Sequence, residues 1–135
     1  PRDPVGAAQV QRWLSIAAGE LAAGPNAARL VLVFGAKLDH ERAKTIAARL
    51  FTLLDASLDG RRFLVGEGPT IADVALYSYT ACAPEGAVPL EPFRNVRSWL
   101  ERIEALPGFV PMTPARARQP HPDAAPADTA GHAPS

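Results

Sequence analysis

Hydrophobic residues recur every three or four positions along most of this chain. They form one stripe in residues 5–21, and the same spacing returns in residues 39–58, 70–82 and 93–105. Such a period places the apolar side chains on one face of an α-helix, which packs on a core. No stretch longer than a few residues alternates apolar and polar positions as a half-buried strand does. The pattern therefore predicts an all-α helical bundle of about five helices, with residues 26–34 as the additional one.

Special residues mark the expected ends of these helices. Gly24-Pro25 interrupts the first stripe, because proline lacks an N–H and its ring clashes with the preceding turn. Asn26 is expected to cap a separate helix that ends at Gly35, and Asp39 to cap the long helix that follows. Residues 83–92 hold three prolines and are expected to form a loop.

The sharpest local signal lies at Thr70 and Asp73. These two residues have the spacing of a capping box, in which each side chain accepts a hydrogen bond from the backbone N–H of the other. Such a cap contributes about 0.5–2 kcal/mol to stability. It predicts a helix start after the short apolar run at residues 63–65.

The composition changes after Met112. Residues 113–135 are rich in Ala, Pro, Asp and His and contain no aromatic and no β-branched apolar residue. Such a segment buries too little apolar surface to offset its ordering entropy. The expected organisation is one helical domain over residues 1–112 and a disordered tail over residues 113–135.

Charge and cysteine content remove several function classes. The chain has 14 basic and 14 acidic residues, so no long-range field favours nucleic acid or an anionic membrane. A single cysteine, Cys82, excludes an intrachain disulfide and a cysteine-based zinc site. No signal peptide and no membrane-spanning run is apparent, so a cytoplasmic location is expected. The chain opens with Pro1, and we expect the natural polypeptide to begin upstream.

One strip of small residues is a candidate binding surface. At 100° per residue, Ser15, Ala18, Gly19 and Ala22 share a face of the first helix. Another backbone, a partner helix or a peptide-like ligand can approach closely there. The alternative is a solvated surface in a chain where Ala and Gly are abundant.

Several segments, in order, resemble a known family. Their residues are Trp13-Leu14-Ser15, Phe63-Leu64-Val65-Gly66, Pro69-Thr70-Ile71-Ala72-Asp73, Trp99-Leu100 and Leu106-Pro107-Gly108-Phe109. Over about residues 1–112 the chain resembles the C-terminal helical domain of bacterial glutathione transferases. The resemblance implies two-domain proteins in which an upstream thioredoxin-like domain carries the catalytic residue. No catalytic and no metal-binding residue is therefore expected in this chain.

The resemblance also implies which residues contact glutathione, the expected co-substrate. Ser15 would reach the γ-glutamyl end of glutathione bound to the neighbouring subunit of a homodimer. Gly19, Glu20 and Ala22 would lie along the ligand and the pocket for a small-molecule electrophile. Arg29 would pair with a glutathione carboxylate. The alternatives are a solvated carboxylate for Glu20 and an exposed helical charge for Arg29.

These expectations lead to one main hypothesis and two alternatives. The main hypothesis is the acceptor-substrate-binding half of a glutathione transferase, which is not catalytic alone. Its parent would conjugate glutathione to electrophiles or carry out glutathione-dependent reduction. The first alternative is a non-catalytic protein–protein interaction module of the same fold, and the second is a truncated product without independent activity.

Overall fold

The computed structural model describes residues 1–115, and every regular element in that range is helical. The predicted all-α fold is therefore confirmed. Five α-helices are present between residues 1 and 115, joined by a π-helical segment and a short 3₁₀ helix. Of the tail predicted for residues 113–135, all but the first three residues lie outside the described range.

The first helix does not break where the sequence predicted. α1 (Pro4–Ile16) continues directly into a π-helical segment, η1 (Ala17–Asn26), and then into α2 (Ala27–Phe34). Asn26 has helical dihedral angles, φ −66° and ψ −47°, and its side chain makes no capping hydrogen bond, so the predicted cap is wrong. A π-helical turn moves the hydrogen bonds one residue further along, which lets the helix pass Pro25 without ending.

Gly24 serves helix packing rather than a helix break. It is buried in η1, where this segment crosses the next helix, α3 (His40–Ser57). A Cβ atom at position 24 would lie 2.8 Å from the backbone nitrogen of Ala47. Only glycine permits so close an approach of the two backbones.

Two predicted helix starts are confirmed. The Oδ1 atom of Asp39 accepts the backbone N–H of Arg42 at 3.0 Å and caps α3. α4 (Ile71–Ala81) begins with the capping box, in which Oδ2 of Asp73 accepts the Thr70 backbone N–H at 2.8 Å. The hydroxyl of Thr70 accepts the backbone N–H of Ala72 at 3.2 Å.

The part of the chain after α4 differs from the expected loop. Residues Ala83–Gly86 form a 3₁₀ helix, η2, because proline is tolerated in the first turn. α5 (Arg94–Glu104) then follows. Its N-terminus is capped by a residue from α3, since Oδ1 of Asp55 accepts the backbone N–H groups of Asn95 and Val96 at 2.8 and 3.1 Å.

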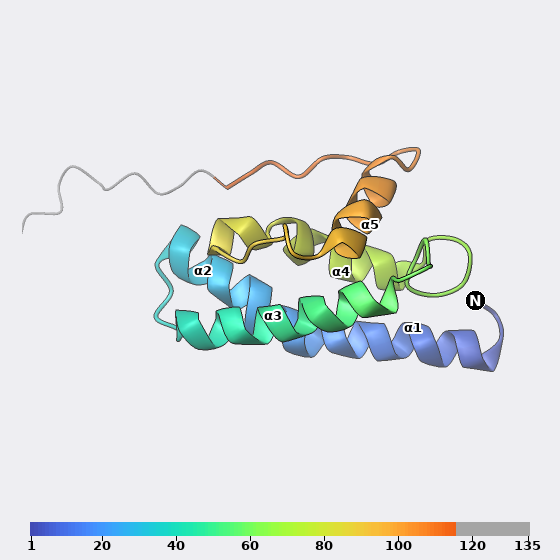
Figure 1. The fold of residues 1–135 in the computed structure, drawn as a ribbon, viewed down its shortest axis with the longest axis horizontal. Coiled ribbons are helices and arrows are strands. Elements are labelled where there is room, and N and C mark those ends of the chain that lie inside the picture. Colours follow the sequence, from blue (N-terminus) through green and yellow to red (C-terminus); the bar gives the residue numbers. More distant parts are fainter. Residues whose placement is uncertain (116–135) are drawn as a thin grey trace, which may run out of the picture.

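The helices enclose one hydrophobic core. α4 contacts α1, η1, α5 and η2, while α3 contacts η1, α2 and α5. In Figure 1, α3 lies along the long axis of the molecule, and the segment after α5 returns along the edge opposite α1. The largest fully buried side chains include Trp99, Phe51, Leu21, Leu54 and Leu76. This packing leaves one face of η1 exposed and a cavity between α4 and the segment that follows α5, and these are the two sites described next.

Candidate functional site

A hollow of about 540 Å³ lies between η1 and the first turn of α3. Four small residues line its η1 side: Ala18, Gly19, Ala22 and Ala23. Asp39 and Arg42 line the α3 side, together with Leu38 from the preceding linker. Three of the four residues of the predicted small-residue strip, Ala18, Gly19 and Ala22, are therefore part of a concave surface.

The hollow is open because η1 carries almost no side chain there. A Cβ atom at Gly19 would have no heavy atom within 4 Å, so the backbone of η1 is directly accessible from solvent. Glycine inside a helix costs about 1 kcal/mol relative to alanine. No packing contact in the structure offsets that cost, unlike the one at Gly24.

The polar groups of the hollow lie at the α3 end. The carboxylate of Asp39 is occupied by the backbone N–H of Arg42. Within residues 1–115, the Arg42 guanidinium forms no salt bridge. The hollow thus combines a small apolar wall with one carboxylate, that of Asp39, and one exposed guanidinium, that of Arg42, to which a carboxylate of a peptide-like ligand can bind. Among residues 1–115, no Ser, Thr, Cys, Lys, His or Tyr lines the hollow, and its one carboxylate, that of Asp39, already caps α3.

The five residues predicted to contact glutathione do not all meet at this hollow. Gly19 and Ala22 line it, whereas Ser15 and Glu20 are exposed and lie outside its lining. The hydroxyl of Ser15 donates a hydrogen bond to the carbonyl of Gln11 at 3.0 Å. The 100° spacing used for the strip holds for an α-helix, whereas the chain is π-helical from Ala17 onward.

Arg29 lies elsewhere, between α2 and η2. Its Nε atom forms an ion pair with Oε2 of Glu85, and both side chains are largely buried, with 17% and 22% exposed. The hydrogen bond from Arg29 lowers the pKa of Glu85. The Arg29 guanidinium also lies 5.5 Å from the centroid of the Phe34 ring. In this structure its charge is therefore satisfied inside the protein.

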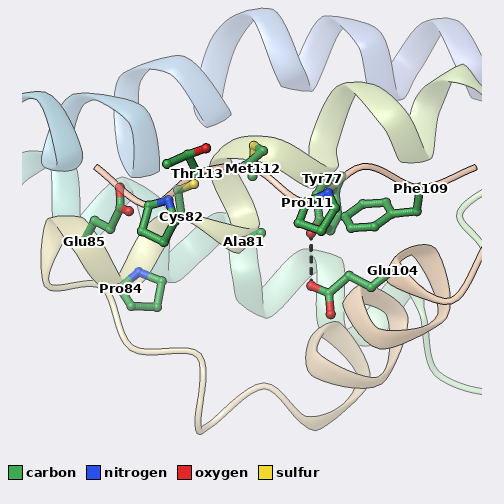
Figure 2. Close-up of a pocket in the computed structure, with 11 residues that line it drawn as sticks. Tyr77, Ala81, Cys82, Pro84, Glu85, Glu104, Phe109, Pro111, Met112 and Thr113 are labelled. Carbon is green, nitrogen blue, oxygen red and sulfur yellow. Dashed lines mark hydrogen bonds between the residues drawn. The ribbon is translucent and has the colours of Figure 1, made fainter. Parts of the chain in front are cut away.

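A second cavity, of about 480 Å³, lies between α4 and the segment that follows α5 (Figure 2). The hydroxyl of Tyr77 donates to Oε1 of Glu104 at 3.0 Å at one end of it. Burial, and then this bond, raise the pKa of Tyr77 to about 12. Burial also raises the pKa of the Cys82 thiol, which makes it a poor nucleophile. None of these three residues was predicted to contact a ligand.

Residues 1–115 hold neither a metal-binding cluster nor a membrane-spanning helix. No group of three or more His, Cys, Asp or Glu side chains there is placed to hold a metal ion. Over the same range, no helix is both long and apolar enough to cross a membrane.

Comparisons with known proteins give a consistent result. The family model "Glutathione S-transferase, C-terminal domain" matches residues 11–107. No curated protein matches the chain. Among solved structures, a glutathione S-transferase from Pseudomonas fluorescens Pf-5 superposes with a TM-score of 0.78 at 25% identity, over 82% of this chain and 58% of that one.

Two more solved structures agree with this result. A glutathione S-transferase from Xanthobacter autotrophicus Py2 has a TM-score of 0.74 at 31% identity, over 82% of this chain and 56% of that one. A possible glutathione S-transferase from Rhodopseudomonas palustris has the same fold, with a TM-score of 0.73 at 24% identity, over 98% of this chain and 63% of that one. The chain thus spans between 56% and 63% of the length of these proteins.

Proposed function

Because this chain belongs to the glutathione S-transferase C-terminal domain family, we propose that it is the acceptor-substrate-binding half of a glutathione transferase. In the complete protein, the thiolate of glutathione would attack an electrophile held by the helical half, or would take part in glutathione-dependent reduction. The group that activates the thiol would belong to an upstream thioredoxin-like domain. This chain would supply binding surface and no catalytic group.

The hollow beside η1 is the observation that carries this proposal. Gly19 and Ala22 line it, and no atom of residues 1–115 fills the space above Gly19. A backbone left open in this way suits a peptide-like molecule such as glutathione or the body of an electrophile. Arg42 at the rim would attract a carboxylate.

The remaining predicted contacts take roles that depend on the complete assembly. Ser15 in α1 and Glu20 in η1 are both exposed, so a neighbouring subunit or ligand can reach them. Because the Ser15 hydroxyl already donates its hydrogen bond to the Gln11 carbonyl, it would accept a hydrogen bond from the ligand. Arg29 would bind a glutathione carboxylate only after leaving Glu85. A homodimer, a thioredoxin-like partner domain and a cytoplasmic location are parts of the same proposal.

Two measurements test it. The reading frame upstream of Pro1 is expected to encode a thioredoxin-like domain, and its absence would refute the proposal. This chain alone, titrated with glutathione while its tryptophan fluorescence is followed, is expected to show no saturable binding below the millimolar range. Micromolar affinity would mean that the helical half carries a complete glutathione site.

Variants of the longer polypeptide then locate the site. Ala22→Leu would fill the hollow and is expected to lower kcat/KM for the electrophile about tenfold or more, through lost binding space. Ala48→Leu is the matched control, because Ala48 is exposed on α3 and lies outside the hollow. Equal effects of the two substitutions would count against this site.

A second function is favoured by a different observation. Leu32, Phe34 and Leu38 are large apolar residues with at least half of their surface exposed at the end of α2 and in the following linker. Exposed apolar side chains of this size are available for a protein contact, which is what a non-catalytic interaction module would need. Transferase activity of the longer polypeptide would decide against that alternative.

A further inference from the structure

The chain after α5 forms a strap that is fixed at both ends. We call residues 109–115 the C-terminal strap. At its beginning, the Phe109 ring packs edge-on against Tyr77, with centroids 5.4 Å apart and an interplanar angle of 86°. At its end, the backbone N–H of Ala115 donates to Oε1 of Glu85 at 3.0 Å. The strap thus runs past the side of α4 that carries Tyr77 and Ala81, from α5 to η2.

The cavity of Figure 2 lies beneath this strap. Ala81 and Pro84 contribute apolar surface from α4 and η2, while Phe109, Pro111 and Met112 contribute it from the strap. Its volume of about 480 Å³ is in the range that holds small organic ligands in proteins. The space is therefore large enough for one or two aromatic rings.

The charges around the cavity all have one sign. Of the residues between 1 and 115, Glu85 and Glu104 line it, and no Lys, Arg or His does so. Glu85 is neutralised by Arg29. Glu104 accepts one hydrogen bond, from Tyr77, and forms no salt bridge with any residue between 1 and 115. The cavity thus combines an apolar wall with the carboxylate of Glu104, which lies at its solvent-exposed edge.

We propose that this cavity binds an organic cation, with its apolar body beneath the C-terminal strap and its ammonium group at Glu104. The rings of Tyr77 and Phe109 add a favourable surface for a cation. An anionic ligand is disfavoured by the charge of Glu104. This site is separate from the hollow beside η1, and it does not depend on the proposed transferase function.

Cys82 provides a local reporter, because it lines the cavity and is the only cysteine of the chain. Its alkylation by iodoacetamide at fixed pH is followed in the full chain by mass spectrometry. Three probes share one aryl body: 1-naphthylmethylammonium, 1-naphthylmethanol and 1-naphthylacetate. We expect the ammonium probe to slow alkylation at least fivefold at saturation, and the acetate to leave the rate unchanged. Equal protection by all three probes, or protection by none, overturns the proposal.

A pair of variants tests the role of Glu104. Glu104→Gln keeps an oxygen for the Tyr77 hydroxyl but removes the charge, and is expected to weaken binding of the ammonium probe about fivefold. The affinity for 1-naphthylmethanol should not change. Glu101→Gln is the matched control, because Glu101 is exposed on the same helix and does not line the cavity. An equal effect of both variants on ammonium binding, in proteins shown by circular dichroism to be folded, overturns the assignment to this cavity.

Discussion

The indole N–H of Trp99 donates to Oδ1 of Asp73 across 2.8 Å, with both side chains buried. The same oxygen accepts the backbone N–H of Leu64 at 3.0 Å, and the other carboxylate oxygen accepts that of Thr70. One carboxylate therefore joins the loop before α4, the first turn of α4 and α5.

Replacing Asp73 with Ala should lower the stability of the protein far more than the removal of a helix cap alone. Three donors lose their partner in the substituted protein, and a buried unsatisfied donor costs about 1–3 kcal/mol. We expect the free energy of unfolding to fall by about 3 kcal/mol or more, measured by urea denaturation. Thr70→Ala, which removes the cap hydroxyl alone, should cost about 1 kcal/mol. Equal losses in the two variants would contradict a joining role for Asp73.

Gly86 should tolerate no side chain. A Cβ atom at this position would lie 2.6 Å from the backbone nitrogen of Arg29, so η2 and α2 would have to separate. We expect Gly86→Ala to lower the free energy of unfolding by about 1–3 kcal/mol, as overpacked cores do. Gly68→Ala is the control, because no atom lies within 4 Å of its Cβ position, and it should change stability by less than about 0.5 kcal/mol. Thermal melts of both variants measure the two changes in stability. Equal melting temperatures would contradict the close packing of η2 on α2.

Gly19→Ala should stabilise the protein, whereas Gly86→Ala should destabilise it. The added methyl group meets no atom, and alanine is favoured over glycine in helices by about 1 kcal/mol. We expect the free energy of unfolding to rise by about 0.5–1 kcal/mol in chemical denaturation. A lower stability would show that η1 depends on the conformational freedom of glycine. A gain in stability with reduced transferase activity in the longer polypeptide would indicate that the glycine is kept for ligand access.

The ion pair of Arg29 with Glu85 should make stability depend on pH. The folded state lowers the pKa of Glu85, chiefly through the hydrogen bond from Arg29. The stabilisation is therefore fully present above the pKa of unfolded glutamate, and is lost as the pH falls through the lowered value. At pH 7 we expect Glu85→Gln to reduce the free energy of unfolding by about 1 kcal/mol.

The difference between wild type and Glu85→Gln should then shrink in acid. Glu91→Gln is the control, because Glu91 is exposed and makes no hydrogen bond or salt bridge with a residue between 1 and 115. Urea denaturation at several pH values between 3 and 7 measures all three proteins. A difference that stays constant over this range would mean that the Glu85 charge does not stabilise the fold.

Local signals in the sequence were sufficient for the helix starts that depend on nearby residues. Thr70 and Asp73 are three positions apart, and Asp39 caps the turn that directly follows it. The cap of α5 could not be predicted in this way. Asp55 lies 40 positions before Asn95, and only the packing of α3 against α5 brings them together.

The predicted break at Gly24-Pro25 was wrong because tertiary contacts decided the outcome. Pro25 alone favours the end of a helix, but Gly24 lets the same segment pack closely on Ala47. Continuing the helix in π-helical form preserves that contact. A sequence pattern based on α-helical spacing does not predict this π-helical segment.

The candidate sites were predictable to different degrees. Gly19 and Ala22 stood out because small residues gathered on one face of a predicted helix, and the hollow contains both. The partner of Arg29 is 56 positions away, so its ion pair had no local signal. The cavity beneath the strap also had none, because an extended segment such as residues 109–115 carries no helical period to show which helix it covers.

The π-helical segment has a consequence for how the length of this chain can vary. A hydrogen-bonded ring in a π-helix holds one residue more than the ring of an α-helix. Deletion of a single residue within Ala17–Asn26 can therefore be absorbed by tightening a turn to α-helical form, while Trp13 and Ala28 stay in the core. The same deletion inside α4 would rotate every later side chain of that helix off its face. Where homologous chains differ in length by one residue in the first helix, we therefore expect the insertion or deletion to lie within Ala17–Asn26.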